Sequence, residues 1–216
     1  MVERYKEVHI GGEGEIVEKK SRFIATVCAI QTEDEAIAFI ESTKKKYWDA
    51  KHNCSAFVLG MNSEISRCSD DGEPSGTAGR PMLEVLLGAE VRNTAVVVTR
   101  YFGGTLLGTG GLVRAYTKAV QRGLEESVIA EYRFCLRMEL LIDYNGIGKV
   151  QYILAKGNYL ITASDYAETI RVEVLLPEGE AQGVIAELVE ATNGRIEAKE
   201  IGKGYCAVVN GETFFR

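Results

Sequence analysis

The stretch RYFGGTLLGTGGL, residues 100–112, decides how the first half of the chain is organised, and it holds five of the chain's 23 glycines. The continuous apolar run 94–99 precedes it and predicts a strand that is buried on both faces. A helix to about Ser127 follows, because apolar residues recur at helical spacing at Leu112, Ala115, Tyr116, Ala119, Val120, Gly123 and Leu124. Strand, glycine loop and helix is the layout of a phosphate-binding cradle, so we first tested this stretch against known phosphate motifs.

Neither of the two common phosphate motifs matches the stretch. A Walker loop requires Lys after its second glycine, but Thr109 stands at that position. The dinucleotide fingerprint fails because Val113 occupies the place of its third glycine. Two general features of an anion site remain: glycines that allow close backbone approach, and a helix N-terminus that attracts anions. Arg114 lies in the first helical turn, where the helix dipole does not favour a cation, which indicates a nearby anion. We favour the alternative, a solvated helix face, because Lys118 and Arg122 repeat the cation at four-residue spacing.

A second segment, SDDGEPSGTAGRP at residues 69–81, has no hydrophobic periodicity and predicts a long polar loop of the kind that often carries function. Its carboxylates, Asp70, Asp71 and Glu73, lack the spacing of a calcium loop. Asp-Gly and Glu-Pro-Ser-Gly favour turns, so we interpret the segment as a turn without a metal. Pro81 is expected to begin the next helix, which covers MLEVLLGAE.

Further elements are predicted around these two segments. Thr32 and Glu35 form a capping box that begins a helix, and Lys44, Lys45 and Lys46 end it, where cations stabilise a helix C-terminus. Strands are expected at residues 14–19, 22–30, 54–59 and 64–68.

The pair His52 and Cys54 suggests a third kind of site. Residues two apart in a strand point to the same face, so the histidine is placed to act as base for a cysteine nucleophile. The alternative is that Cys54 is a small buried hydrophobic residue. We favour that alternative.

The last third of the chain has a different pattern. We predict a strand at 134–142, a helix at 147–156 closed by Gly157, strands at 159–164 and 169–176, a helix at 178–192 and a strand at 196–209. This βαββαβ order is that of a ferredoxin-like unit. The fold class is therefore α+β, with one domain at residues 1–130 and a second at residues 131–216.

Composition narrows the class of protein. The 216 residues are 46% hydrophobic and 26% charged, which is ordinary for a soluble globular protein, and no run is long enough to cross a membrane. The first residues lack the apolar stretch of a signal peptide. Five scattered cysteines without a CxxC pair argue against a disulfide framework or a zinc ribbon, and they fit the reducing cytoplasm.

Charge is unevenly distributed along the chain, whose net charge is -6. Residues 1–130 hold 16 Lys and Arg against 18 Asp and Glu, whereas residues 131–216 hold 9 against 13. A nucleic-acid contact is therefore expected in the first part. If its loops converge, the cations at positions 51, 80, 100 and 114 form a basic groove with exposed Tyr101 and Phe102. Such a groove suits a phosphate backbone or an acidic peptide.

The two long segments, together with KKSRFIA at 19–25 and HNCSAF at 52–57, resemble the Impact family and its bacterial, YigZ-like members. The resemblance implies an N-terminal domain similar to the second domain of a small-subunit ribosomal protein, here an α/β sandwich. It also implies a C-terminal domain similar to domains of elongation factor G. Eukaryotic relatives regulate translation by binding an activator of a translation-initiation kinase, through an N-terminal domain that this sequence lacks. The resemblance implies no catalytic residues.

We therefore expect a cytoplasmic, non-enzymatic regulator or binding module that contacts RNA, the ribosome or a ribosome-associated protein, with no cofactor, metal or membrane partner. The alternative is an enzyme that acts on a nucleotide or another phosphorylated small molecule. The predicted binding surface consists of Arg22, Lys51, His52, Asp70, Asp71, Gly72, Glu73, Pro74, Gly76, Thr77, Arg80, Arg100, Phe102, Gly103, Gly104, Gly108, Gly110, Gly111 and Arg114.

Overall fold

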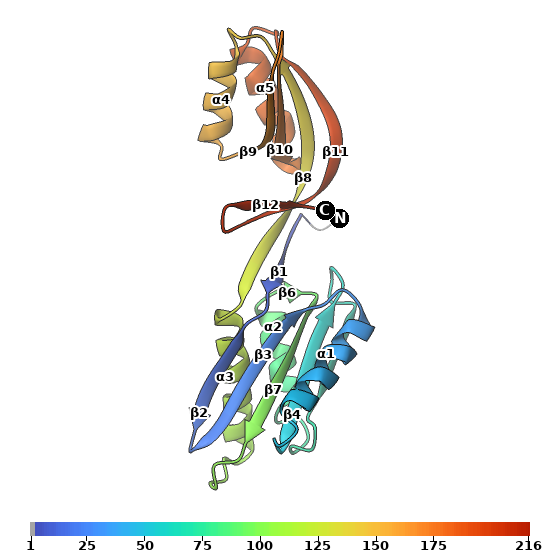
Figure 1. The fold of residues 1–216 in the computed structure, drawn as a ribbon, viewed down its shortest axis with the longest axis vertical. Helices are drawn as coiled ribbons and strands as arrows, with labels where there is room; N and C mark the ends of the chain where they lie inside the picture. Colours follow the sequence, from blue (N-terminus) through green and yellow to red (C-terminus); the bar gives the residue numbers. More distant parts are fainter. Residues whose placement is uncertain (1–2) are drawn as a thin grey trace. The chain divides into compact units, whose positions relative to one another are not determined.

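The structure, a computed structural model, describes residues 3–216 and confirms the α+β class (Figure 1). The chain forms two compact units. One comprises Tyr5–Glu131, and the other comprises Tyr132–Arg216 with residues 3 and 4. We call them the N-terminal unit and the C-terminal unit and describe each by itself.

A five-stranded antiparallel sheet forms the centre of the N-terminal unit. Its order is β2-β3-β7-β4-β5, with bounds Glu13–Glu18, Ser21–Ala29, Thr94–Tyr101, His52–Leu59 and Ile65–Ser69. Seven of the eight residues of β7 are buried, as the continuous apolar run predicts. Two strands that the sequence pattern did not reveal, β1 (Arg4–Ile10) and β6 (Val91–Arg92), pair in parallel with each other.

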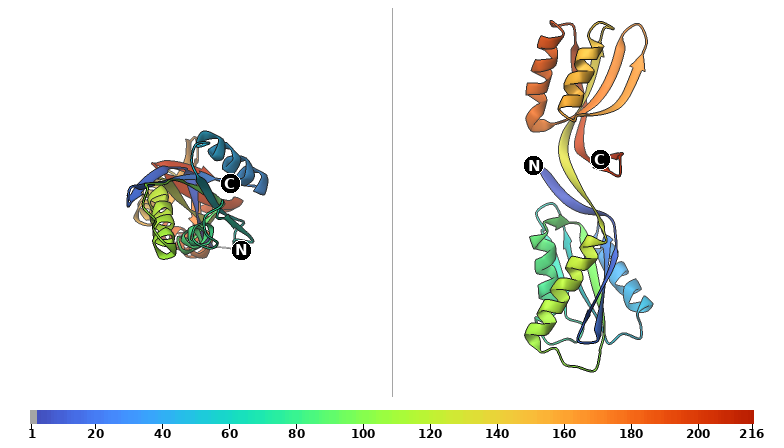
Figure 2. Two further views of the ribbon diagram at one scale, coloured as in Figure 1. Left: turned by 90° about the horizontal axis from the view of Figure 1, so that it is seen from below. Right: turned by 90° about the vertical axis from the view of Figure 1, so that its left-hand side faces the viewer.

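Helices cover both faces of this sheet. Helix α1 (Glu33–Lys46) lies on one face, while α2 (Gly79–Gly88) and α3 (Thr109–Glu125) lie on the other (Figure 2, right). The seven apolar positions predicted for α3 are its seven buried residues, and they pack against β3 and β7 with α2 beside them. A smaller cluster lies under α1. Alternate residues of β7 therefore enter two different cores, which explains its unbroken apolar run.

Two helix starts show how side chains set the ends of elements. Thr32 Oγ1 accepts a hydrogen bond from the Glu35 N–H at 3.1 Å, as the capping box predicts, but the Glu35 carboxylate accepts from the N–H of Gln31 instead of Thr32. Helix α2 begins at Gly79, two residues before the predicted Pro81. The carboxylate of Asp70 accepts hydrogen bonds from the N–H groups of Ala78 and Gly79. Because these donors at the helix N-terminus have a partner, the helix can begin before Pro81.

The C-terminal unit has the predicted ferredoxin-like arrangement. Its elements are residues 132–142 of β8 (Val128–Ile142), α4 (Ile147–Lys156), β9 (Leu160–Tyr166), β10 (Ile170–Pro177), α5 (Glu178–Ala191), β11 (Glu197–Val209) and β12 (Glu212–Phe215). The strands pair antiparallel in the order β9-β10-β8-β11-β12. Strand β8 begins six residues earlier than predicted, and β12 was not predicted.

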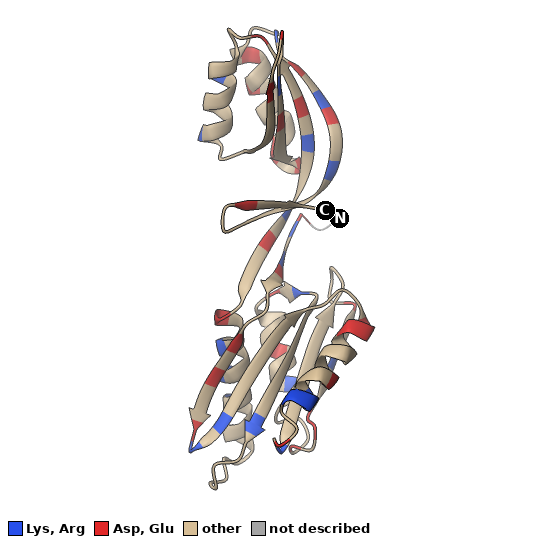
Figure 3. Ribbon diagram, viewed as in Figure 1, with Lys and Arg blue, Asp and Glu red and all other residues tan. Residues whose placement is uncertain are grey.

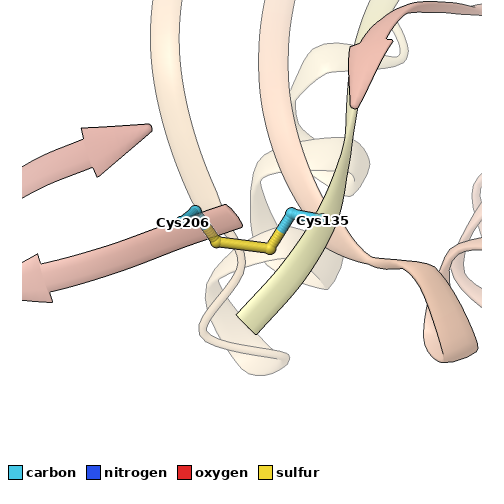
Figure 4. Close-up of a disulfide and its surroundings, with 2 residues drawn as sticks. All are labelled: Cys135 and Cys206. Atoms are coloured by element: carbon cyan, nitrogen blue, oxygen red, sulfur yellow. A yellow bond between two sulfur atoms is a disulfide. The ribbon is translucent and has the colours of Figure 1, made fainter. Parts of the chain in front are cut away.

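One disulfide corrects the expectation drawn from the cysteine pattern. Cys135 of β8 and Cys206 of β11 are bonded, with their Cα atoms 6.2 Å apart (Figure 4). The antiparallel register pairs Cys135 with Gly204 and Cys206 with Arg133, so the two cysteines are diagonal neighbours across the strands. Because 71 positions separate them in the sequence, only the strand register reveals their proximity.

None of the five helices formed by the described residues has the length and apolarity needed to cross a lipid bilayer.

Candidate functional site: a pocket beside the glycine loop

The two glycine-rich segments meet at one end of the N-terminal sheet. There β7 ends and β4 begins, and the antiparallel register pairs His52 with Arg100. A pocket of about 500 Å³ opens at this end. Its lining, which we call the glycine-loop pocket, consists of Lys51, His52, Gly72, Glu73, Pro74, Arg100, Phe102, Leu106, Leu107, Gly108, Thr109 and Leu112.

A larger hollow of about 880 Å³ lies between α2 and α3, but its chemistry is different. Its charged lining residues are Glu84 and Glu125, and neither a histidine nor a cation is among the residues that line it. The convergence of chemically distinct groups therefore favours the glycine-loop pocket as the candidate site.

A buried ion pair forms one wall of the glycine-loop pocket. Arg100 Nη1 donates to Glu73 Oε1 at 2.6 Å, and only 8% and 3% of the two side chains is exposed. The Tyr116 hydroxyl donates to the same oxygen at 2.9 Å, and burial raises the pKa of this phenol, which keeps it protonated. Arg100 also lies within 6 Å of the Phe23 and Phe102 ring centroids. Its Nε is buried and has no hydrogen-bond partner in residues 3–216.

His52 is held in a defined orientation beside this pair. Its Nδ1 lies 2.8 Å from the backbone carbonyl of Asp71, and because a carbonyl only accepts, Nδ1 carries a proton. In the neutral tautomer the other nitrogen, Nε2, is an acceptor, and it lies 4.0 Å from Glu73 Oε1, beyond hydrogen-bonding distance. In this tautomer His52 Nε2 presents an open acceptor at the pocket wall, whereas Glu73 Oε1 already accepts from Arg100 and Tyr116.

Asp70 organises the loop that leads to Glu73. Its carboxylate accepts backbone N–H groups from Gly76, Ala78 and Gly79 at 2.8, 3.0 and 2.8 Å. Burial alone would raise the pKa of this carboxyl, but the three donors outweigh burial and hold it below its usual value.

Asp71 anchors the same loop to β4 and α1. Its two carboxylate oxygens accept from the Asn53 N–H at 2.7 Å and from Lys44 Nζ at 2.8 Å. Burial opposes ionisation here too, but these partners lower the pKa of the Asp71 carboxyl. Both aspartates thus act in turns, and within residues 3–216 no group of three or more His, Cys, Asp or Glu side chains is placed to hold a metal ion.

The glycines of residues 102–108 fit the path of the chain around the pocket. The Gly103 N–H donates to Ser21 Oγ at 3.1 Å, and a Cβ at this position would lie 2.1 Å from the Lys20 carbonyl carbon. Gly104 and Gly108 have φ values of 83° and 70°, which side-chain-bearing residues rarely adopt. Helix α3 follows without a side-chain cap, so the backbone N–H groups of its first turn are available at the pocket.

Gly103→Ala tests this reading of the loop. The added methyl group collides with backbone atoms that do not rotate away, so we expect the N-terminal unit to lose about 1–3 kcal/mol of unfolding free energy. Gly110→Ala is the matched control, since a methyl group there meets only the end of the Arg114 side chain and should improve the helix slightly. Urea unfolding of both variants measures the difference, and equal stability would contradict the proposed role of Gly103.

The structure brings together only part of the predicted surface. Eight predicted residues line the glycine-loop pocket, namely Lys51, His52, Gly72, Glu73, Pro74, Arg100, Phe102 and Gly108. Three predicted cations do not line it. Arg22 pairs with Glu15, Arg80 pairs with Glu84, and Arg114 is exposed on α3. The other predicted residues also lie outside the lining, namely Asp70, Asp71, Gly76, Thr77, Gly103, Gly104, Gly110 and Gly111.

Sequence reasoning missed the apolar part of the pocket. Leu106, Leu107 and Leu112 line it beside Thr109, and Leu106 is 83% exposed. A pair of leucines inside a glycine loop was the available signal, because loops seldom carry adjacent large apolar residues. The hydrogen bond from Tyr116 to Glu73 had no such signal. Tyr116 belongs to the apolar stripe of α3, so the sequence predicts only that it packs in the core.

Cys54 does not have the properties of a nucleophile. Its thiol is fully buried and contacts the Asp70 carbonyl at 3.0 Å and the Tyr116 hydroxyl at 3.3 Å. Burial raises the pKa of this thiol to about 12, so the reactive thiolate is scarce at neutral pH. The interpretation of Cys54 as a small buried residue therefore holds.

Cations at the pocket end of the N-terminal unit lie beside carboxylates, as the ion pairs Arg22–Glu15, Lys44–Asp71 and Arg100–Glu73 show. Figure 3 shows blue segments where β3 begins, where β7 ends and at the C-terminal end of α1. The register places Arg22 opposite Tyr101, with its guanidinium 5.6 Å from that ring.

These features define a class of protein: an α+β chain of two units, with a partly cationic pocket between a polar turn and a glycine loop. Residues 19–124 match the model of the Impact N-terminal domain, and residues 140–195 match a domain of unknown function, DUF1949. The chain belongs to the IMPACT family.

The relatives support this assignment over most of the chain. The chain is 44% identical to the IMPACT family member YvyE of Bacillus subtilis, over 93% of this chain and 92% of that protein. It is 36% identical to the IMPACT family member YigZ of Escherichia coli, over 83% and 89% of the two chains. A crystal structure of a hypothetical protein, 33% identical, aligns with a TM-score of 0.59 over 94% of this chain and 99% of that one.

Proposed function

We propose that the N-terminal unit is a non-enzymatic RNA-binding module of the cytoplasm that acts in translation, with the glycine-loop pocket as its binding site. One observation carries the proposal: an exposed lysine, an exposed aromatic ring and a helix N-terminus surround a single pocket. Lys51 supplies charge, Phe102 is 49% exposed, and Thr109 begins α3. Single-stranded RNA is bound by such combinations of charge and stacking surfaces.

Membership of the IMPACT family supports the link to translation, since the family resemblance implies a role in translational regulation for eukaryotic members. The overall charge of -6 does not oppose RNA binding, because the acidic excess is larger in residues 131–216 than in the part that forms the pocket. The ribosome, whose surface exposes RNA, is the partner that we infer.

Fluorescence anisotropy of a labelled single-stranded RNA tests the proposal. We expect binding at low salt, with an affinity that falls linearly with salt concentration on logarithmic axes, because phosphate contacts release counterions. The absence of binding to RNA and to purified ribosomes at low salt would refute the proposal.

Lys51→Ala locates the phosphate contact. Lys51 is exposed at the pocket, so its loss should weaken RNA binding and reduce the salt slope by about 0.7, the value for one contact to a single strand. Lys118→Ala is the matched control, since this exposed lysine of α3 does not line the pocket. An equal loss in both variants would indicate general charge attraction instead of a site.

A phosphorylated small molecule or nucleotide is the second candidate ligand, with an enzymatic role as the alternative function. The pocket volume of about 500 Å³ favours it, because small-molecule sites span about 300–1,000 Å³. His52 Nε2, to which no described residue donates, would then serve as a general base. Calorimetric titration with ATP, GTP and phosphorylated metabolites tests this candidate, which is discarded if no heat of binding appears.

A further inference from the structure

We propose that the glycine-loop pocket holds one unstacked base of the bound RNA and selects bases that carry an exocyclic amino group. This inference rests on the proposed function and specifies which part of the RNA the pocket recognises. It follows from three properties of the pocket: an acceptor on His52, apolar walls and an unused donor.

The first property is the acceptor that His52 presents, since Glu73 Oε1 already accepts from Arg100 and Tyr116. The Asp71 carbonyl accepts from the protonated Nδ1 of His52, so Nε2 is the acceptor of the neutral tautomer. Glu73 Oε1 lies 4.0 Å from this nitrogen, and no described residue donates to Nε2. A ligand group that meets this wall must therefore donate hydrogen bonds, and a carbonyl oxygen placed there would be repelled.

The second property is the apolar character of the remaining wall. Phe102, Leu107 and Leu112 line the pocket, and Leu106 extends it on the loop. Such walls favour a flat, largely apolar ring over a flexible polar chain. A nucleobase is such a ring, and it carries its hydrogen-bonding groups on the edge.

The third property is the unused donor of Arg100. Its side chain is more than nine-tenths buried, yet Nε has no partner among residues 3–216. Buried donors without partners are rare in folded proteins, so this atom indicates capacity for an acceptor beside the pocket. The amino group and ring nitrogen of cytosine or adenine place a donor next to an acceptor. Uracil has a carbonyl oxygen where cytosine has the amino group.

Oligocytidine and oligouridine of equal length distinguish the possibilities, because the two pyrimidines differ at this edge group. We expect oligocytidine to bind the full-length protein about 10-fold more tightly, within the range of about 1–3 kcal/mol for a specific base contact. In His52→Asn the amide can still donate to the Asp71 carbonyl, but the Nε2 acceptor is lost. The ratio of the two affinities should fall toward one in this variant, with its fold checked by circular dichroism.

The outcomes separate this inference from the proposed function. Equal binding of both oligonucleotides by the unmodified protein, or tighter binding of oligouridine, overturns base selection but leaves RNA binding intact. A preference that persists in His52→Asn assigns selection to other residues and also overturns the inference. If neither oligonucleotide nor any other RNA binds, the proposed function itself fails, and this inference fails with it.

Discussion

Replacing Glu73 with alanine should destabilise the N-terminal unit by about 3–5 kcal/mol, because the change leaves the Arg100 cation buried without its partner. Tyr116 loses an acceptor at the same time, which adds to the effect. Hydrogen exchange of peptides from β4 and β7 during urea titration measures the loss in this unit separately from the C-terminal unit.

Two comparison variants make this result specific to the buried pair. Glu84→Ala removes an exposed ion pair with Arg80 and should change stability by about 0.5 kcal/mol or less. The double variant Glu73→Gln with Arg100→Met removes both charges, so it should lose less stability than the sum of the single changes. A loss of less than about 1 kcal/mol in Glu73→Ala would show that the pair is not a structural element of the pocket wall.

Asp70→Ala should also have a large effect, since it removes the acceptor of three backbone N–H groups. We expect a loss of about 1–3 kcal/mol and faster hydrogen exchange in residues 70–78. Asp70→Asn is the matched variant, because its amide oxygen can still accept from Ala78 and Gly79. It should retain part of the stability, and equal loss in the two variants would contradict this account.

Acid should reduce the stability advantage of the unmodified protein over the Asp70→Asn variant. Because the folded state lowers the pKa of the Asp70 carboxyl, its stabilisation is present above the usual value of about 3.9 and is lost as the pH falls through the lower folded-state pKa. The unfolding free energies of the two proteins should therefore converge in strong acid. A difference that grows on acidification would contradict the assignment.

The sequence predicted those helices and strands whose apolar residues follow the pattern of their packing, with one buried face in a helix or two buried faces in a central strand. The apolar stripe of α3 and the continuous run of β7 both depend on local periodicity, and the structure confirms both. The short parallel pairing of β1 with β6 was not predicted, because it joins segments about 85 residues apart whose strand patterns are weak. The disulfide depends likewise on the register of β8 with β11, which periodicity does not specify.

The site was predicted in outline but not in its polar detail. The two glycine-rich segments indicated where the loops meet, and eight of the named residues line the pocket there. Arg80, by contrast, follows the turn closely in sequence, yet its helical position at the start of α2 directs it to Glu84. The pairing of Arg100 with Glu73 could not be predicted, because it depends on the path of loop 69–81. The hydrogen bonds that Asp70 accepts determine that path.

Amide chemical-shift mapping of the isotope-labelled full-length protein with oligocytidine tests the central claim most directly. If the glycine-loop pocket is the RNA site, the largest shifts should occur in residues 51–52, 72–73 and 102–112, and Lys51→Ala should reduce them. Shifts that cluster on the C-terminal unit, or a spectrum that stays unchanged at saturating oligonucleotide, would contradict the account.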